Sequence, residues 1–394
     1  MPFSSVLGAQ SVVKPGVCTS STRPAAPFDG QVVYLTDTDQ TLVWDGTAWT
    51  VLAPIAGGRN ALINGDFKVW QRGTAVQSNA GQGAYAADRW CGSHQFQNSR
   101  TQRTSISSPP SGLLSQFALR SSSSTTAQSA NGTRMRIAQK LESLNSYRLR
   151  GRPVTLSFWV RFSNATISSI NNAAGGGSST YGDFGYSIGS YTSTTDSATN
   201  TSAADVGITA SITNGSLPIT WTKYTLTGTI SSTANNVDVV FGFTALGSTT
   251  SADTEWFELA QIQLEVGTIA TPFEFEDAQV TLAKCQRYYS RTTNDGASNY
   301  NRYGTGGFNA STSGIMFVQF PVKMRSAPSS VDYSTLALWD YVTVIPITNI
   351  VFDSSSSLTC TLNCTVASGG TLSRPCQLLS NNSASAYLGF SAEL

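Results

Sequence analysis

The stretch PVTLSFWVRF, residues 153–162, indicates the fold because its apolar and polar side chains alternate. The two rows are Val154, Leu156, Phe158 and Val160 on one side and Thr155, Ser157, Trp159 and Arg161 on the other. A period of two predicts a strand that packs one row against a core and turns the other outward. Similar runs follow at 219–230 (ITWTKYTLTGTI), 237–246 (VDVVFGFTAL) and 255–267 (EWFELAQIQLEVG). Many short strands at this spacing predict a two-sheet sandwich of the jelly-roll type over residues 57–275.

Smaller β units flank this sandwich. Residues 1–56 hold the short apolar runs QVVYL and TLVW, separated by the turn-forming sequence DTDQ, and this pattern predicts a β-meander. So few strands bury too little surface to be stable alone, and we therefore expect this attachment module to bind a partner. Residues 291–394 alternate again, for example in GIMFVQFPV (314–322), and predict a C-terminal β-sandwich tip.

One short helix is expected between the two larger domains, within residues 276–290. Its apolar stripe consists of Ala278, Leu282, Cys285 and Tyr289. Asp277 stands where a helix N-cap is expected. The predicted fold class is mainly β, with tandem antiparallel β-sandwich or jelly-roll domains, a small N-terminal β-meander and one short inter-domain helix.

The chain is poor in charged residues. It has 24 Lys and Arg against 23 Asp and Glu, and these make up 12% of its 394 residues, where about 25% is usual. The near-zero net charge and the lack of a basic run argue against nucleic-acid binding. No apolar run approaches the length of a membrane span, so we expect no membrane insertion. The first residues lack the features of a signal peptide, so we expect no export by the ordinary secretory route.

The six cysteines do not form a recognisable metal-binding pattern. They are Cys18, Cys91, Cys285, Cys360, Cys364 and Cys376. Only Cys360 and Cys364 are close in sequence, and the single histidine, His94, is distant from both. Buried free thiols are the favoured interpretation. A disulfide among the three C-terminal cysteines is the alternative that the sequence leaves open.

No residues combine into a catalytic motif, so we expect no enzyme. The only serious enzymatic alternative is a pair of carboxylates for glycoside hydrolysis. Acids cluster within residues 255–277, as Glu255, Glu258, Glu265, Glu274, Glu276 and Asp277. On a regular strand, Glu255 and Glu265 would face one side and Glu258 the other. The favoured explanation for this cluster is solvated charge at strand edges.

We expect no cofactor and no metal site; a structural calcium ion is the alternative that the sequence leaves open. Asp66 in INGDF is the candidate ligand, with Asp88 in ADRW as a second. Calcium takes six to eight oxygen ligands, which Asp and Asn side chains and loop carbonyls supply. The favoured interpretation is that Asp66 hydrogen-bonds a turn.

Aromatic side chains with polar neighbours are the candidates for glycan binding, because flat rings stack on sugar faces. The candidates are Tyr300, Arg302 and Tyr303 in the Gly-rich stretch 298–309, Trp339 and Tyr341 in LALWDYV, and Tyr181 and Tyr186 in the long segment 171–205. We interpret 171–205 as a long surface loop. The alternative is that these residues belong to the core or merely occupy surface loops.

Several stretches resemble bacteriophage tail-fibre and tail-tip proteins that carry a jelly-roll module of the carbohydrate-binding type. They are NALINGDFKVWQRGT (60–74), YAADRW (85–90), LRGRPVTLSFWVRF (149–162), WTKYTLTGTI (221–230) and FELAQIQLEVGTIATPFEFEDAQVTLAKCQRYYSR (257–291). The last is the most specific, and GIMFVQFPVKMRSAPS (314–329) is similar to the start of the C-terminal domain in the same proteins. These motifs are structural, so no glycan-contact residue can be transferred from the family.

The resemblance implies a virion structural protein, a tail fibre or tail-tip adhesin located on the phage tail and extracellular after lysis. It implies a homotrimer whose N-terminal module binds other tail or baseplate proteins and whose tip binds host surface polysaccharide without cleaving it. Weak contacts repeated over several chains would give tight adhesion. Two alternatives remain: a purely structural head-fibre, neck or baseplate component, and a glycan depolymerase that uses the acids of 255–277.

Overall fold

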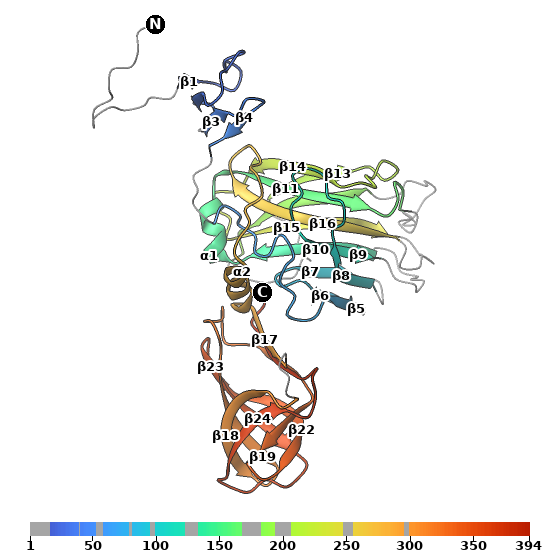
Figure 1. The fold of residues 1–394 in the computed structure, drawn as a ribbon, viewed down its shortest axis with the longest axis vertical. Helices are drawn as coiled ribbons and strands as arrows, with labels where there is room; N and C mark the ends of the chain where they lie inside the picture. The colour runs from blue at the N-terminus through green and yellow to red at the C-terminus, as the bar shows by residue number, and fades with distance from the viewer. Residues whose placement is uncertain are drawn as a thin grey trace, which may run out of the picture.

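Three β units follow one another along the long axis of the molecule in the computed structural model (Figure 1). The structure describes residues 16–38, 40–52, 58–78, 81–94, 99–122, 133–167, 183–193, 206–246, 255–294 and 299–394. The predicted fold class is confirmed: antiparallel sheets dominate, and the helices are short. No helix in these ranges is long and apolar enough to cross a membrane.

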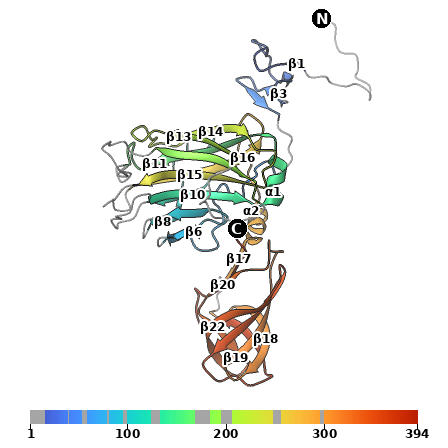
Figure 2. The same cartoon turned by 180° about the vertical axis from the view of Figure 1, so that it is seen from behind.

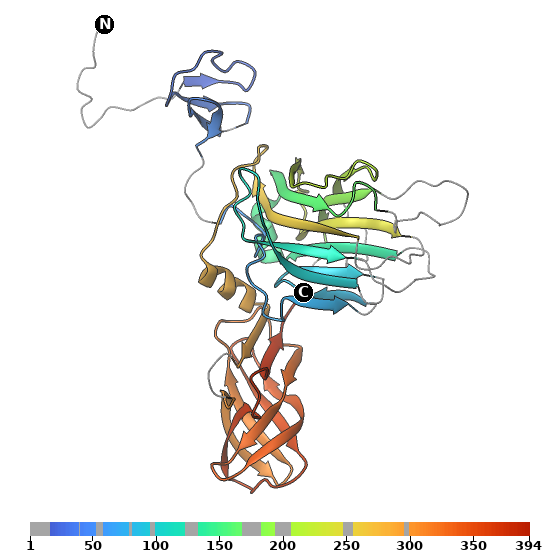
Figure 3. The ribbon, with the colours of Figure 1, turned by 45° about the vertical axis from the view of Figure 1, so that its right-hand side comes forward.

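The N-terminal module is a four-stranded sheet that stands apart from the rest of the chain (Figure 3). Its strands are β1 (Gly16–Cys18), β2 (Val32–Leu35), β3 (Gln40–Trp44) and β4 (Trp49–Val51). Strands β2, β3 and β4 form the predicted meander, and β1 adds to its edge in parallel with β2. Its buried core consists of Val33, Leu35 and Leu42. Three buried side chains make this a small core.

The central domain is a sandwich of two six-stranded antiparallel sheets (Figure 2). The first sheet contains β13 (Val206–Ile212), β12 (Phe184–Tyr191), β15 (Asn236–Leu246), β10 (Thr133–Leu141), β7 (Cys91–His94) and β6 (Gly81–Tyr85), in spatial order. The second contains β14 (Thr222–Thr229), β11 (Pro153–Phe162), β16 (Trp256–Val266), β9 (Phe117–Ser122), β8 (Ser99–Ser105) and β5 (Ala75–Ser78).

Aromatic packing between the sheets forms the core. The apolar row of β11 points inward as predicted, and Phe158 packs against Phe241 and Tyr186 with ring centroids 4.8 and 5.0 Å apart. Phe162 meets Phe184 edge to face at 4.9 Å. These pairs fix the separation and register of the two sheets. The polar row of β11 lies on the outer face of the second sheet.

A β-bulge in β16 corrects the predicted facing of its acids. Gln261 has a φ of +47°, and the β11–β16 register shifts beside it. Leu259 and Ile262, on either side of the bulge, both enter the core. The extra residue therefore places Glu258 and Glu265 on the same outer face, whereas a regular strand would have separated them.

Asp238 on β15 is buried beneath the opposite outer face and supports a prediction about pH. Tyr191 donates a hydrogen bond to its Oδ2 at 2.7 Å, and burial raises the pKa of Asp238 to about 6 from 3.8. Between these two values the folded state binds more protons, so the free energy of unfolding falls as pH rises. We expect Asp238→Asn to be more stable than wild type at pH 8, by about 3 kcal/mol, and to lose this part of the pH dependence. Urea unfolding at pH 4 and pH 8 measures both effects, and lower stability of the variant at pH 8 would contradict the prediction.

The described residues form two short α-helices, where one was expected. The additional helix, α1 (Ser143–Ser146), continues into a 3-10 turn, η1 (Tyr147–Leu149). The predicted helix is α2 (Ala278–Gln286), and the Asp277 side chain caps it by accepting from the Gln279 amide at 2.8 Å. The predicted stripe was partly wrong. Ala278 is exposed, Thr281 is buried, and Tyr289 begins a strand because the helix ends at Gln286.

The C-terminal tip closes into a barrel, which corrects the predicted sandwich. Its strands are β18 (Arg302–Ala310), β19 (Ser313–Gln319), β23 (Thr359–Val366), β22 (Val344–Ser355), β21 (Leu336–Trp339) and β24 (Pro375–Ser380), in order around the barrel. Closure requires β18 to pair with β24, and on the other side of β18 glycines permit the close approach of β19. A Cβ on Gly306 would lie 1.8 Å from the Ile315 carbonyl oxygen.

The cysteines are free thiols, as favoured from the sequence. Five are buried, and Cys18 is half-buried. Cys360, Cys364 and Cys376 belong to the barrel core. Burial raises the pKa of Cys360 and Cys364 to about 12 and that of Cys376 to about 11. The predicted disulfide alternative is therefore not found among these three.

A second small sheet joins the tip to the sandwich. It contains β17 (Tyr289–Thr293), β25 (Tyr387–Ser391) and β20 (Ser330–Ser334). Glu393, just after β25, forms a buried ion pair with Arg89 of the sandwich and a second with Arg72 at 3.4 Å. The guanidinium carbon of Arg89 lies 3.6 Å from the ring centroid of Tyr288. These contacts couple the two domains through charge and aromatic stacking.

Candidate functional site

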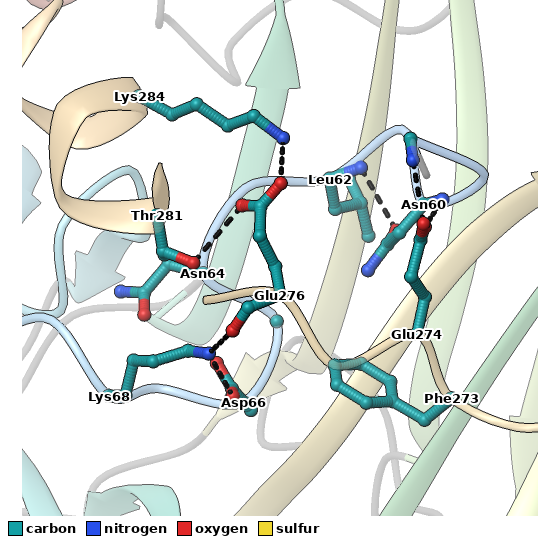
Figure 4. Close-up of a pocket in the computed structure, with 12 residues that line it drawn as sticks. Asn60, Leu62, Asn64, Asp66, Lys68, Phe273, Glu274, Glu276, Thr281 and Lys284 are labelled. Atoms are coloured by element: carbon teal, nitrogen blue, oxygen red, sulfur yellow. Dashed lines mark hydrogen bonds and ion pairs between the residues drawn. The ribbon is translucent and has the colours of Figure 1, made fainter. Parts of the chain in front are cut away.

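Two of the stretches that carry the resemblance, 60–74 and 257–291, meet beside α2 (Figure 4). Glu274 accepts from the amides of Gly58 at 2.6 Å and Asn60 at 2.7 Å, and Asn60 in turn bonds the backbone of β16. A Cβ on Gly65 would lie 2.1 Å from the Ile262 carbonyl oxygen, so only glycine fits there. The small hollow between these segments measures about 20 Å³. These contacts therefore hold residues 58–65 against β16 and against the segment that leads from β16 to α2.

The calcium candidate Asp66 lines the same small hollow. Its Oδ2 is 2.9 Å from Nζ of Lys68, which also donates to the Glu276 carbonyl (Figure 4). Asp88 is buried and accepts from the Gln71 amide and side chain, both at 2.6 Å. The Lys68 ammonium thus stands where a cation would bind Asp66. Within the described ranges, no three His, Cys, Asp or Glu side chains group as metal ligands.

Three of the six acids of 255–277 are buried, which corrects for them the interpretation as solvated strand-edge charge, whereas Glu274 and Glu276 are half-buried and Asp277 is exposed. Glu255, Glu258 and Glu265 are each at most 5% exposed. Glu258 accepts from Arg120 at 2.7 Å and Arg161 at 2.6 Å. Other acids of this cluster also bond within the protein. Glu265 accepts from Thr271, and Glu274 accepts from the amides of 58–60. Glu276 accepts from Lys284 and Thr281, and Asp277 caps α2. Glu258, Glu265, Glu274, Glu276 and Asp277 therefore all have hydrogen-bond or ion-pair partners within the protein.

A larger groove crosses the outer face of the second sheet, with a volume of about 590 Å³. Strands β11, β14 and β16 form its floor, the loop around Ser111–Leu114 forms one wall, and residues 270–275 form the other. We call it the outer groove. Its lining residues are Ser111, Gly112, Leu114, Ser157, Trp159, Lys223, Gln261, Ala270, Thr271, Pro272, Phe273 and Phe275.

Trp159 lies at the centre of the floor. Strand pairing places it opposite Lys223 of β14 and Ala260 of β16. A Cβ on Gly112 would lie 3.6 Å from the Trp159 indole, so the loop passes directly over one end of the ring. Trp159 remains half-buried and packs beside Trp221 and Leu113. The indole is therefore held rigidly while part of it faces the groove.

The bulged Gln261 adds an unsatisfied polar group to the floor. Its residue is 3% exposed, and its Nε2 has no hydrogen-bond partner among the described residues. A buried amide nitrogen without a partner costs free energy unless something binds it. The bulge therefore keeps a hydrogen-bond donor close to the Trp159 ring.

Apolar side chains form the groove walls. Leu114 is 73% exposed and Phe275 is 48% exposed, and Phe273 packs against Phe275 with ring centroids 4.9 Å apart. Exposed rings beside a few polar groups are the usual composition of a site for an uncharged sugar. Among the described residues that line the groove there is no Asp or Glu.

The predicted glycan-binding residues are only partly brought together. Arg302, Trp339 and Tyr341 lie side by side on the barrel, and the Tyr300 carbonyl accepts from Arg302 at 3.1 Å. Arg302 and Tyr303 belong to β18, so the predicted Gly-rich loop is in large part a strand. Tyr303 donates to the Ala386 carbonyl at 3.0 Å.

Tyr186 was wrongly predicted as a glycan-binding residue. It is 7% exposed and packs in the sandwich core, because β12 runs through the segment expected to be a loop. Tyr181 lies outside the described residues.

Sequence reasoning missed the outer groove. Its signals were a tryptophan in the outward row of PVTLSFWVRF and two phenylalanines alternating with acids in TPFEFED. Neither feature of the sequence shows that residues 153–162 and 271–277 lie on the same face of one sheet. How close these two segments come depends on the order of the strands in that sheet.

No family model matches the sequence, and no curated protein sequence does. Similar solved structures include the enzymatically active domain of tailspike protein 4 of bacteriophage CBA120, at 14% identity and a TM-score of 0.28, covering 53% of this chain and 21% of that chain. A CBM4 carbohydrate-binding module is 12% identical with a TM-score of 0.27, covering 52% and 97%. The C-terminal family 22 module of Clostridium thermocellum Xyn10B is 12% identical with a TM-score of 0.25, covering 50% and 98%. At these TM-scores the similarities carry no argument about function.

Proposed function

We propose that the protein is a non-catalytic carbohydrate-binding adhesin, and that the outer groove binds an uncharged glycan. The observation that carries the proposal is the combination of the Trp159 indole, the exposed Phe275 and the unpartnered Gln261 amide in one groove. Sugar C–H faces would stack on the rings. Sugar hydroxyls would accept from Gln261 and Lys223, and the Ser157 hydroxyl adds a further hydrogen-bonding group.

We further propose that the adhesin belongs to a phage tail fibre or tail tip. The family resemblance and the serial β units support this assignment. In this proposal the N-terminal module binds tail or baseplate proteins, three chains associate, and the fibre acts on the virion and outside the cell after lysis. Because single sugar contacts are weak, repetition over several chains raises the effective affinity for host polysaccharide.

Removing the Trp159 ring tests the groove. We expect Trp159→Ala to weaken binding to a neutral polysaccharide about tenfold or more, because the central stacking surface is lost. Affinity electrophoresis of the full chain through gels containing xylan, mannan, dextran or neutral host polysaccharide measures the change. Trp159→Phe should retain most of the binding.

Two further variants make the test specific. Phe275→Ala removes an exposed wall ring at little cost to folding and should also weaken binding, whereas Phe28→Ala, which removes a ring 68% exposed on the N-terminal module, should not. Equal binding of wild type, Trp159→Ala and Phe275→Ala would refute the groove as the site. No binding of wild type to any of these polysaccharides would favour a purely structural role, and release of reducing ends would favour a depolymerase.

A further inference from the structure

The barrel carries an ordered row of side chains on three neighbouring strands, away from the outer groove. The guanidinium carbon of Arg302 on β18 lies 5.5 Å from the ring centroid of Trp339 on β21. Trp339 and Tyr341 have ring centroids 4.7 Å apart. Gln377 on β24, between them, accepts from Nε of Arg302 at 2.9 Å. We call Arg302, Gln377, Trp339 and Tyr341 the tip platform.

Tyr341 is held in a backbone conformation that a tyrosine rarely adopts. Its φ is +68°, and its residue is 57% exposed. Left-handed backbone at a bulky residue is strained, and such strain collects at functional sites. A glycine would occupy this turn position without strain, so the backbone of the turn does not require a tyrosine.

The turn beneath Tyr341 is built to maintain this conformation. The buried Asp340 accepts from the amides of Val342 at 3.0 Å and Thr343 at 2.7 Å. Its second carboxylate oxygen accepts from Arg374 at 2.7 Å. The hydrogen bond from Arg374 and those from the turn lower the pKa of Asp340 below its usual value. The Asp340 carboxylate therefore keeps its charge, and these hydrogen bonds, in mild acid.

We propose that the tip platform binds an acidic sugar, a pyranose that carries a carboxylate. The sugar ring would lie on the Trp339 and Tyr341 faces, and its carboxylate would accept from Nη2 of Arg302. Nη2 has no hydrogen-bond partner among the described residues, whereas Nε and Nη1 are already fixed by Gln377 and the Tyr300 carbonyl.

The fixed guanidinium is what selects an acid. An arginine whose fork is already oriented loses little freedom when it binds a carboxylate. The neighbouring Asp340 does not compete, because Arg374 and the turn amides satisfy it. The inference is independent of the proposed function, since it concerns another domain and a charged rather than an uncharged sugar.

Two variants of the full chain test the tip platform by affinity electrophoresis in polygalacturonate and in polysialic acid. Arg302→Gln should weaken binding to the acidic polymer at least about tenfold, and Arg302→Lys less. Tyr341→Gly should weaken it by a similar factor while the melting temperature of the full chain stays equal or rises, because the strain is removed. A tyrosine with only a structural role would lower the melting temperature when removed.

The controls distinguish an effect of the polymer's charge from an effect of the tip platform. Fully methyl-esterified polygalacturonate, which has the same sugar backbone without charge, should bind weakly to wild type and equally to Arg302→Gln. Lys323→Gln removes an exposed positive charge elsewhere on the tip and should leave binding unchanged. Trp159→Ala should not affect acid binding, and Arg302→Gln should not affect neutral glycan binding. Equal affinity for acid and ester, no binding to either acidic polymer, or displacement by inorganic phosphate alone would overturn the proposal.

Discussion

Replacing Arg89 with methionine should destabilise the protein by about 3–5 kcal/mol and uncouple the sandwich from the tip. The Arg89 side chain is 2% exposed, and its partner Glu393 is 7% exposed. Burial alone lowers the pKa of Arg89, but the Glu393 carboxylate raises it above its ordinary value. Without Arg89, the Glu393 carboxylate would stay buried with only Arg72, at 3.4 Å, as a charged partner.

Calorimetry measures the effect. We expect the two domains to unfold in one transition in wild type and in two separate transitions in the variant. In the double variant Arg89→Met, Glu393→Gln no unpaired charge is left, so it should recover part of the lost stability. Arg23→Met, at an exposed arginine of the N-terminal module, should change little. A single unshifted transition in Arg89→Met would show that the ion pair does not couple the domains.

Replacing Glu258 with alanine should cost about 3 kcal/mol of unfolding free energy. Its side chain is fully buried and accepts from Arg120, Arg161 and Thr104 at 2.6 to 2.8 Å. Both guanidinium groups also lie over Trp256, at 4.0 and 5.6 Å from its ring centroid. Loss of the carboxylate leaves two partly buried cations facing each other without compensation.

Urea unfolding measures this loss. Glu258→Gln keeps the size and one acceptor, so we expect it to cost less than alanine, and Asp29→Asn at an exposed acid should cost almost nothing. A loss below about 1 kcal/mol in Glu258→Ala would indicate that the cluster is effectively solvated. Intact glycan binding in folded Glu258→Gln would agree with a structural role for this acid.

Local patterns in the sequence were sufficient for much of the fold. Alternation in 153–162 predicted both the strand and its buried face, and Asp277 predicted the helix start, because each depends on near neighbours in the chain. The barrel was not predictable in this way. Its closure requires pairing between β18 and β24, about seventy residues apart, and alternation alone does not distinguish a barrel from a sandwich.

The candidate sites show the same division between local and long-range information. The aromatic residues of the tip platform were identified from composition, but their alignment depends on the order β18, β24, β21. The bulge at Gln261 contains no glycine that would have marked it in the sequence. The prediction that Glu258 and Glu265 lie on opposite faces of the strand was therefore wrong. Tyr186 was misassigned because Gly- and Ser-rich flanks hid the alternation of FGYSIGSY, residues 184–191.

Closure of the tip barrel has a consequence for crowded surroundings. A sheet that ends in an open strand exposes free amides and carbonyls to which a foreign strand can add. The barrel pairs each of its six strands on both sides. Barrels of many copies can therefore lie close together without pairing strand to strand. A protease that must bind an extended segment also has little unpaired backbone to bind in the barrel.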